Sequence, residues 1–123
     1  MAIVYADVGC DEMLKVYYND DRPAGGNNHT LKLFVNNYTP LQTSIASDFT
    51  EAAGGGYAAK TLTNGSWTVT VGNDPSDAAY AQQTFTFTGA LTTNPTIYGV
   101  FVVDSDGILI FAEAFSPYTP TLN

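Results

Sequence analysis

The clearest hydrophobic pattern lies near the C-terminus, where apolar runs at residues 97–103 and 108–111 flank Ser105-Asp106-Gly107. Gly107 can supply the positive φ that a tight turn requires, so the pattern predicts a β-hairpin. Successive side chains of a strand point to opposite faces of a sheet, and both faces of this hairpin are apolar. We therefore expect something to cover each face.

Alternation divides the apolar residues of the hairpin between the two faces. In the first strand, one face carries Tyr98, Val100 and Val102, and the other carries Ile97, Phe101 and Val103. In the second strand, Ile108 and Ile110 are opposed to Leu109 and Phe111. An opposite sheet would cover one face. A neighbouring subunit would cover the other, or alternatively an N-terminal arm or helix of the same chain.

Further strands are predicted at residues 31–37, 57–62, 66–71 and 82–89, separated by clusters of turn residues. In the third of these, Trp67, Val69 and Val71 should point inward and the threonines between them outward. Phe85 and Phe87 alternate with threonine in the same way. Short strands rich in threonine and aromatic residues favour a mainly β fold, an antiparallel β-sandwich.

The N-terminal part of the chain follows a different pattern. Residues 11–19 place acidic residues in a possible first helical turn, and Cys10, Leu14 and Tyr17 on one stripe, which predicts a short N-terminal helix. Residues 15–19 could instead form a strand, and a loop is predicted at 19–28. We expect an extended N-terminal arm at residues 1–8, a single β-sandwich domain at 9–115 and a C-terminal tail at 116–123.

Composition narrows the possible partners. Charged residues make up 13% of the chain, so part of the surface is expected to contact another protein. The net charge is −8 and the few basic residues are scattered, which disfavours direct binding of nucleic acid. Nothing in the sequence resembles a membrane span or a signal peptide, so synthesis in the cytoplasm is expected. Cys10 is the only cysteine, which excludes an intrachain disulfide.

Candidate catalytic and metal-binding residues are few. His29 is the only histidine, and no G-x-S-x-G motif accompanies it. Residues 104–107, DSDG, resemble the start of a calcium loop, but the following residues are apolar, so a turn is favoured. Glu51 and Glu113 could form the carboxylate pair of a hydrolase, although any acidic chain offers such pairs. We therefore predict no catalytic, cofactor or metal site and no enzymatic activity.

Several segments, in this order and spacing, carry a family resemblance: FTEAAGGGYAAKTL, SWTVT, AYAQQTFTFTG and NPTIYGVFVVDSDGILIFAEAF. They resemble small virion structural proteins of tailed bacteriophages, including cyanophages, over roughly residues 31–115. The opening MAIVYADVGCDEML is also similar to the start of such proteins. Some members have Trp and Arg where this chain has Phe111 and Ala114, so an interface built on those two side chains is not carried over.

The resemblance implies a β-sandwich that decorates a particle. We expect a capsid decoration or cement protein that binds the major capsid protein on the outer surface of the assembled head. A homo-oligomer is expected, with a trimer favoured. The alternative is a tail or fibre module that binds a host receptor or carbohydrate through exposed loop aromatics such as Tyr38 and Tyr57. The expected interface residues come from the arm, the tail and the hairpin: Ile3, Val4, Tyr5, Phe101, Val103, Leu109, Phe111 and Tyr118.

Overall fold

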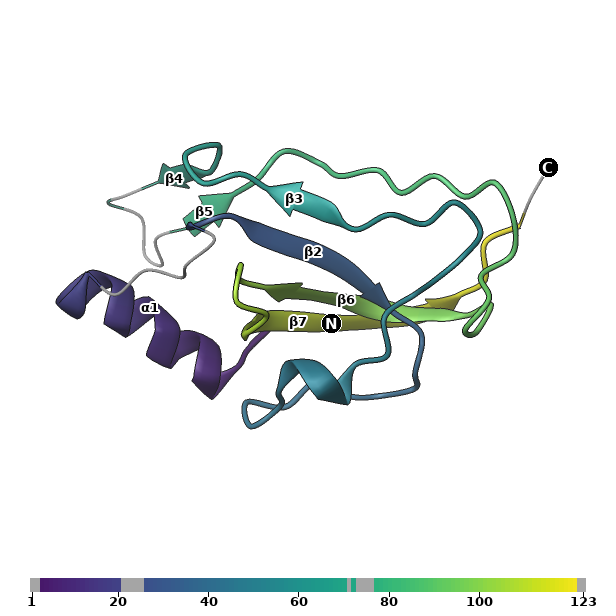
Figure 1. Cartoon of the computed structure of the whole chain (residues 1–123), viewed down its shortest axis with the longest axis horizontal. Helices are drawn as coiled ribbons and strands as arrows, with labels where there is room; N and C mark the ends of the chain where they lie inside the picture. The colour runs from purple at the N-terminus through teal and green to yellow at the C-terminus, as the bar shows by residue number, and fades with distance from the viewer. Residues whose placement is uncertain (1–2, 21–25, 71, 73–76, 122–123) are drawn as a thin grey trace.

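A computed structural model describes residues 3–20, 26–70, 72 and 77–121. It is mainly β, with antiparallel sheets and one short N-terminal α-helix, which confirms the predicted fold class (Figure 1). The elements in chain order are β1 (Val4–Tyr5), α1 (Asp7–Asn19), β2 (His29–Phe34), the 3-10 helix η1 (Ala46–Asp48), β3 (Lys60–Leu62), β4 (Thr68–Thr70), β5 (Asp77–Ala79), β6 (Ile97–Val103) and β7 (Leu109–Tyr118).

The main layer is a five-stranded antiparallel sheet in the order β1-β7-β6-β2-β3. The predicted hairpin forms its centre as β6 and β7, and Gly107 in the turn has a φ of 84°. Because β2 and β7 flank β6, this strand is paired on both sides, and Phe101 and Val102 within it are buried. The hairpin is therefore the centre of the fold as well as its clearest sequence signal.

One face of the main sheet is covered by residues 36–50, which include η1. Phe49 from this segment stacks on Phe101 of β6 at a centroid distance of 5.1 Å and meets the ring of Phe34 edge-on. Val103 and Leu109 complete the cluster on this face. The chain's own core therefore covers this side of the hairpin.

The opposite face is covered less completely. Leu33, Val100 and Val102 on this face have Trp67 and Phe85 among their neighbours from the second layer. That layer consists of the two-stranded sheet β4-β5 and the extended residues 80–91, which run along the main sheet in Figure 1. The second sheet of the predicted sandwich therefore has only two described strands, each of three residues.

The second layer also corrects two details of the prediction. In residues 82–89 the phenylalanines are half-buried and the threonines exposed, as predicted, but the segment pairs with no described strand. Its backbone instead bonds to the loop formed by the three glycines at 54–56. The N–H of Thr88 donates a hydrogen bond to the carbonyl of Gly55 at 2.8 Å. Val69 was expected to point inward and is 61% exposed. Val71 lies outside the described residues.

Two register shifts in the hairpin change which side chains share a face. Val102 pairs with Phe111 and Val103 with Leu109, so Ile110 is an extra residue, as in a β-bulge. Ile110 and Phe111 both pack near Val102, whereas Leu109 packs with Val103 on the other face. Strict alternation, which groups Leu109 with Phe111, is therefore wrong at this point.

The second shift lies between Ile97 and Gly99. Ile97 packs with Leu33, and Tyr98 packs against the cluster that contains Phe101. Alternation had placed Ile97 with Phe101 and Tyr98 with Val100. The irregular pairing at this end of β6 breaks the two-residue period, so this assignment is also corrected.

Residues 4–8 are part of the domain and do not form a separate arm. Val4 pairs with Ala112 and Tyr5 with Phe111, Ala6 is 1% exposed, and α1 begins at Asp7. The helix thus starts earlier than predicted and leaves the main sheet beside β7. At the other end, β7 continues to Tyr118, so the expected tail is also partly sheet. Residues 1–2 and 122–123 lie outside the described residues.

Candidate functional site

The structure divides the expected interface residues into two groups. Phe101, Val103 and Leu109 are 3%, 5% and 2% exposed and lie in the chain's own core, so they offer no surface to a partner. Their apolar character is explained by folding alone, which corrects their assignment to an interface. The others keep exposed or half-exposed side chains: Ile3, Val4, Tyr5, Phe111 and Tyr118.

Tyr5 and Phe111 mark the part of the main sheet that the second layer leaves open. Their ring centroids lie 5.5 Å apart on neighbouring strands, and Tyr5 is 52% exposed. Phe111, Phe115 and Val100 line an apolar groove of ≈ 490 Å³, and the second layer contributes Trp67, Tyr80 and Phe85 to the same groove. We call the surface formed by Tyr5, Val100, Phe111 and Phe115 the open face. Phe115 was not among the residues expected from the sequence.

The open face adjoins an incompletely paired strand edge. β1 pairs with β7 only at Ala112 and Phe111, and no other described strand pairs with that edge of β7. Residues 113–118 of β7 therefore present backbone groups at the edge of the sheet, with Tyr118 56% exposed. Unpaired edges of this kind can accept a strand from another chain.

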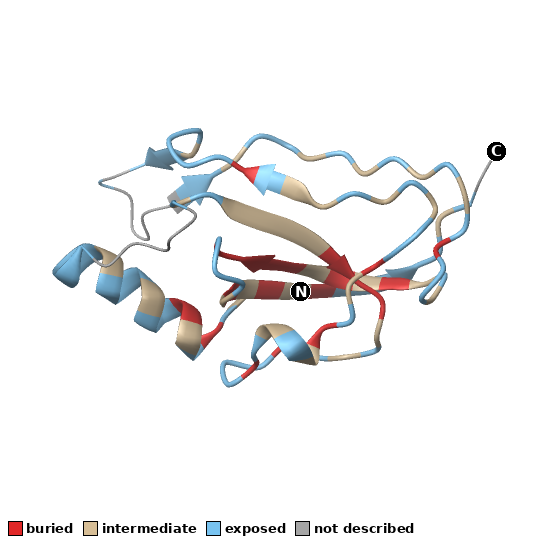
Figure 2. Cartoon of the chain, in the orientation of Figure 1, coloured by how far each residue is buried: buried red, intermediate tan, exposed pale blue. Residues whose placement is uncertain are grey.

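The helix α1 has a second exposed apolar surface. Gly9 is the buried residue of its 13, and red is confined to the start of the helix in Figure 2. The predicted stripe exists, because Cys10, Leu14 and Tyr17 all lie on the exposed side. It does not face the core, since Leu14 is 56% and Tyr17 81% exposed.

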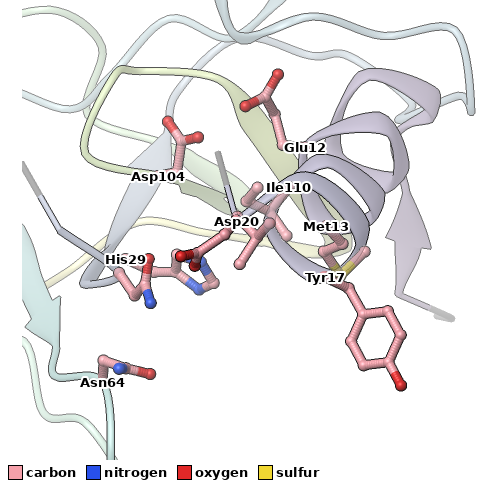
Figure 3. A pocket seen from close by; sticks show the side chains of 10 residues that line it. Glu12, Met13, Tyr17, Asp20, His29, Asn64, Asp104 and Ile110 are labelled. Atoms are coloured by element: carbon pink, nitrogen blue, oxygen red, sulfur yellow. The ribbon is translucent and has the colours of Figure 1, made fainter. Parts of the chain in front are cut away.

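A cleft lies between α1 and the end of the main sheet, with a volume of ≈ 580 Å³ (Figure 3). We call it the helix cleft. Its lining combines acidic, amide and apolar side chains: Glu12, Met13, Val16, Tyr17, Asp20, Asn27, His29, Asn64, Asp104 and Ile110. His29 and Asp104, which are far apart in the sequence, both lie in it. Each of them was a candidate for a separate reason, and no local sequence pattern predicts that they lie in the same cleft.

Asp104 is the most buried acidic residue of the helix cleft, at 4% exposure. Its Oδ1 accepts hydrogen bonds of 2.9 Å from the backbone N–H groups of Asp106 and Ile108. Its Oδ2 is buried and has no hydrogen-bond partner among the described residues. The DSDG segment thus forms the hairpin turn, as the turn interpretation predicts, and leaves one carboxylate oxygen unused.

His29 is half-buried at the start of β2, where it pairs with Leu62 of β3. Burial lowers the pKa of its imidazole below the usual 6.5, and the nearby negative charge of Asp104 partly opposes this shift. The ring therefore tends to be neutral at pH 7. Its centroid lies 6.4 Å from that of Trp67, in an edge-on arrangement.

The remaining candidate residues are engaged in local contacts. Glu51 forms a 2.8 Å ion pair with Lys32 and accepts a hydrogen bond from the hydroxyl of Tyr57 at 3.2 Å. Burial raises the pKa of this tyrosine. Glu113 lies on β7, opposite Val100 of β6. Within the described part of the chain, no group of three or more His, Cys, Asp and Glu side chains is placed to hold a metal ion.

The loop aromatics expected for carbohydrate binding are also occupied. Tyr38 is half-buried against Phe49, and its hydroxyl lies 2.8 Å from Oγ of Ser44. Tyr57 is half-buried beside Phe85, with stacked rings 5.9 Å apart. Both side chains therefore take part in the packing of the domain and do not project from its loops.

Comparison with known proteins adds no relative: no family model, no curated protein and no solved structure matches the chain. Among the described residues, α1 is the one α-helix, and it is too short and too polar to span a membrane.

Proposed function

We propose that this protein is a non-enzymatic structural protein of a tailed-phage virion, a capsid decoration or cement protein. In this proposal it binds the major capsid protein on the outside of the assembled head as a homo-oligomer, with a trimer favoured, and stabilises the shell. The phage assignment comes from the sequence resemblance. The structure contributes surfaces suited to assembly.

The open face is the observation that carries the proposal. A soluble chain ordinarily covers the apolar face of its sheet, whereas Tyr5, Phe111 and Phe115 remain partly exposed beside an unpaired edge of β7. A neighbouring chain could add a strand to that edge and cover the aromatic side chains in the same contact. Aromatic side chains are also the residues that dominate the energetics of protein interfaces.

The helix α1 supports the same conclusion independently. Isolated helices shorter than about 12–15 residues are marginally stable in water, and helices in proteins depend on burial of an apolar face. α1 has 13 residues but buries Gly9 while leaving Leu14 and Tyr17 exposed. Contact with a second protein would bury this stripe.

The charge of the protein fits a position outside the shell. A net charge of −8 would be repelled by packaged DNA, and the low content of charged residues suits close contact between subunits. A protein that binds only the assembled shell stabilises it by mass action, because dissociation of the shell then requires release of the bound protein.

The location can be tested by imaging phage particles labelled with a gold-tagged antibody to this protein. Regular decoration of the head supports the proposal, and gold confined to the tail tip or fibres replaces it with host recognition. Absence of gold from purified particles contradicts both virion assignments.

The surface can be tested by adding purified protein back to heads that lack it. The double variant Tyr5→Glu, Phe115→Glu should bind the heads at least tenfold more weakly than the wild type, because it places charges in the open face. The control Thr84→Glu, Thr86→Glu adds the same charge at exposed positions that do not line the groove. Equal binding of the two double variants would rule out the open face as the contact.

A further inference from the structure

We propose that the helix cleft binds a cationic nitrogen group on an aliphatic stem, an alkylammonium or an alkylguanidinium, with the carboxylate of Asp104 as its anchor. The same chemistry occurs in a lysine or arginine side chain of a partner protein and in a free polyamine. This inference rests on the cleft alone and holds whether or not the protein belongs to a virion.

The unused oxygen of Asp104 is the first reason. A buried carboxylate oxygen without a donor is costly, because the group has lost water and gained nothing in its place. Asp104 lies in the wall of the cleft, and the hairpin turn satisfies only its Oδ1. Oδ2 has almost no exposed surface in the structure, so the Asp104 side chain must turn this oxygen toward the cleft before a ligand N–H can donate the hydrogen bond that it lacks among the described residues.

The character of the lining is the second reason. Glu12 and Asp20 add carboxylates, although each residue also has contacts of its own, and the amides of Asn27 and Asn64 add carbonyl acceptors. Glu12 is also paired with Lys15 at 2.7 Å, so part of its charge is already balanced. No lysine or arginine is among the described residues that line the cleft. The described lining therefore offers carboxylate and carbonyl oxygens, which suit a cation and not an anion.

The apolar wall indicates what the cation is attached to. Met13, Val16 and Ile110 lie in the same cleft as the carboxylates, which provides a surface for methylene groups. The volume of ≈ 580 Å³ lies within the range of roughly 300–1,000 Å³ typical of sites for small molecules. It exceeds what a single inorganic ion needs.

The arrangement of acidic groups favours N–H donors over a metal ion. Hard cations require several oxygen ligands that converge on one point. The described residues hold no such group of three or more ionisable ligands, although several line this cleft. An ammonium or guanidinium, by contrast, can bind through one carboxylate and nearby neutral acceptors.

The direct test is a titration of the full chain followed by amide NMR and calorimetry. The probes are N-acetyl-arginine methylamide and N-acetyl-lysine methylamide for a partner side chain, and spermidine for a free polyamine. N-acetyl-citrulline methylamide is the neutral control. We expect saturable shifts of the amides of Asp106 and Ile108, because both donate to the Asp104 carboxylate. Tighter binding of spermidine would indicate a polyamine site, and tighter binding of the arginine or lysine probe a peptide site.

Matched variants decide whether the cleft is responsible. Asp104→Asn should weaken binding by roughly ten- to a hundredfold, the usual effect of losing a charge-assisted hydrogen bond. Asp106→Asn removes the same charge from an exposed residue of the same turn and should change binding less than about threefold. If the two variants bind equally, or if the citrulline probe binds as well as the arginine probe, the inference is wrong.

A second pair keeps the test valid if Asp104→Asn does not fold. Met13 and Leu14 are both exposed residues of α1, 43% and 56%, but only Met13 lines the cleft. Met13→Lys places a cation of the chain's own at the cleft and should abolish binding of the probes. Leu14→Lys should leave it unchanged, and equal effects of both lysines would also contradict the inference.

Discussion

Gly99 of β6 lies directly against Phe34 of β2. A Cβ at residue 99 would stand 2.5 Å from Cε1 of Phe34 and would also collide with the backbone carbonyl of Glu113. Phe34 is fully buried and holds Phe49 over the sheet at a centroid distance of 5.0 Å. The glycine thus allows the covering segment and the main sheet to pack closely.

Gly99→Ala should therefore destabilise the domain by about 1–3 kcal/mol, the usual cost of overpacking a core. Gly89→Ala is the control, because its added Cβ would meet its nearest neighbour at an ordinary 3.6 Å. Urea unfolding followed by tryptophan fluorescence measures both variants. Equal stability of the two variants would show that β6 and Phe34 can separate without cost.

Gly9 has a similar role between α1 and β7. A Cβ at this position would lie 2.6 Å from Cα of Ile110, and this backbone atom cannot move aside easily. Alanine ordinarily favours a helix over glycine by about 1 kcal/mol, but here we expect the steric effect to prevail. Gly9→Ala should lower the melting temperature and increase cleavage of α1 by proteases. Asp11→Ala, at an exposed helix position, should do neither.

Phe101 and Phe111 should respond differently to truncation. Phe101→Ala removes a 3% exposed ring from the core and should cost about 3–5 kcal/mol of folding free energy. Phe111 is half-exposed on the open face, so Phe111→Ala should cost less in the monomer and weaken assembly more. Unfolding curves and sedimentation velocity separate the two effects. Loss of assembly in Phe101→Ala without loss of stability would place that ring at an interface after all.

Some parts of the fold could be predicted from the sequence and others could not. The β6–β7 hairpin and the alternation of Phe85 and Phe87 depend on neighbouring residues, and local patterns predict them well. The pairing of β1 with β7 does not depend on local sequence, because two residues carry no usable periodicity. The β-bulge at Ile110 changes which face of the sheet the neighbouring side chains occupy, and no turn residue in the sequence indicates it.

The helix and the cleft illustrate the same limit. Gly9 disfavours a helix by propensity, so the sequence pattern began the helix too late, whereas close packing against β7 makes glycine the suitable residue there. The stripe of Cys10, Leu14 and Tyr17 was visible, but an apolar stripe does not reveal what covers it. His29 and Asp104 lie in the same cleft because β2 pairs with β6, with Thr30 opposite Val103. This pairing is a property of the sheet topology and cannot be inferred from local sequence.

His29 makes the free energy of unfolding of the protein depend on pH, and the sign of this dependence can be predicted. Burial lowers the pKa of folded His29 below the usual 6.5, so the unfolded chain binds the proton more readily. The contribution of His29 to the free energy of unfolding is therefore fully present above about pH 6.5, and it is lost as the pH falls toward the pKa of the folded state. Over this interval, wild-type protein should lose more unfolding free energy than His29→Gln, as measured by urea unfolding at about pH 7.5 and about pH 5.5. Asp104→Asn removes the charge that opposes the shift, so it should increase this loss. A wild-type slope no steeper than that of His29→Gln would show that the imidazole is not buried in solution.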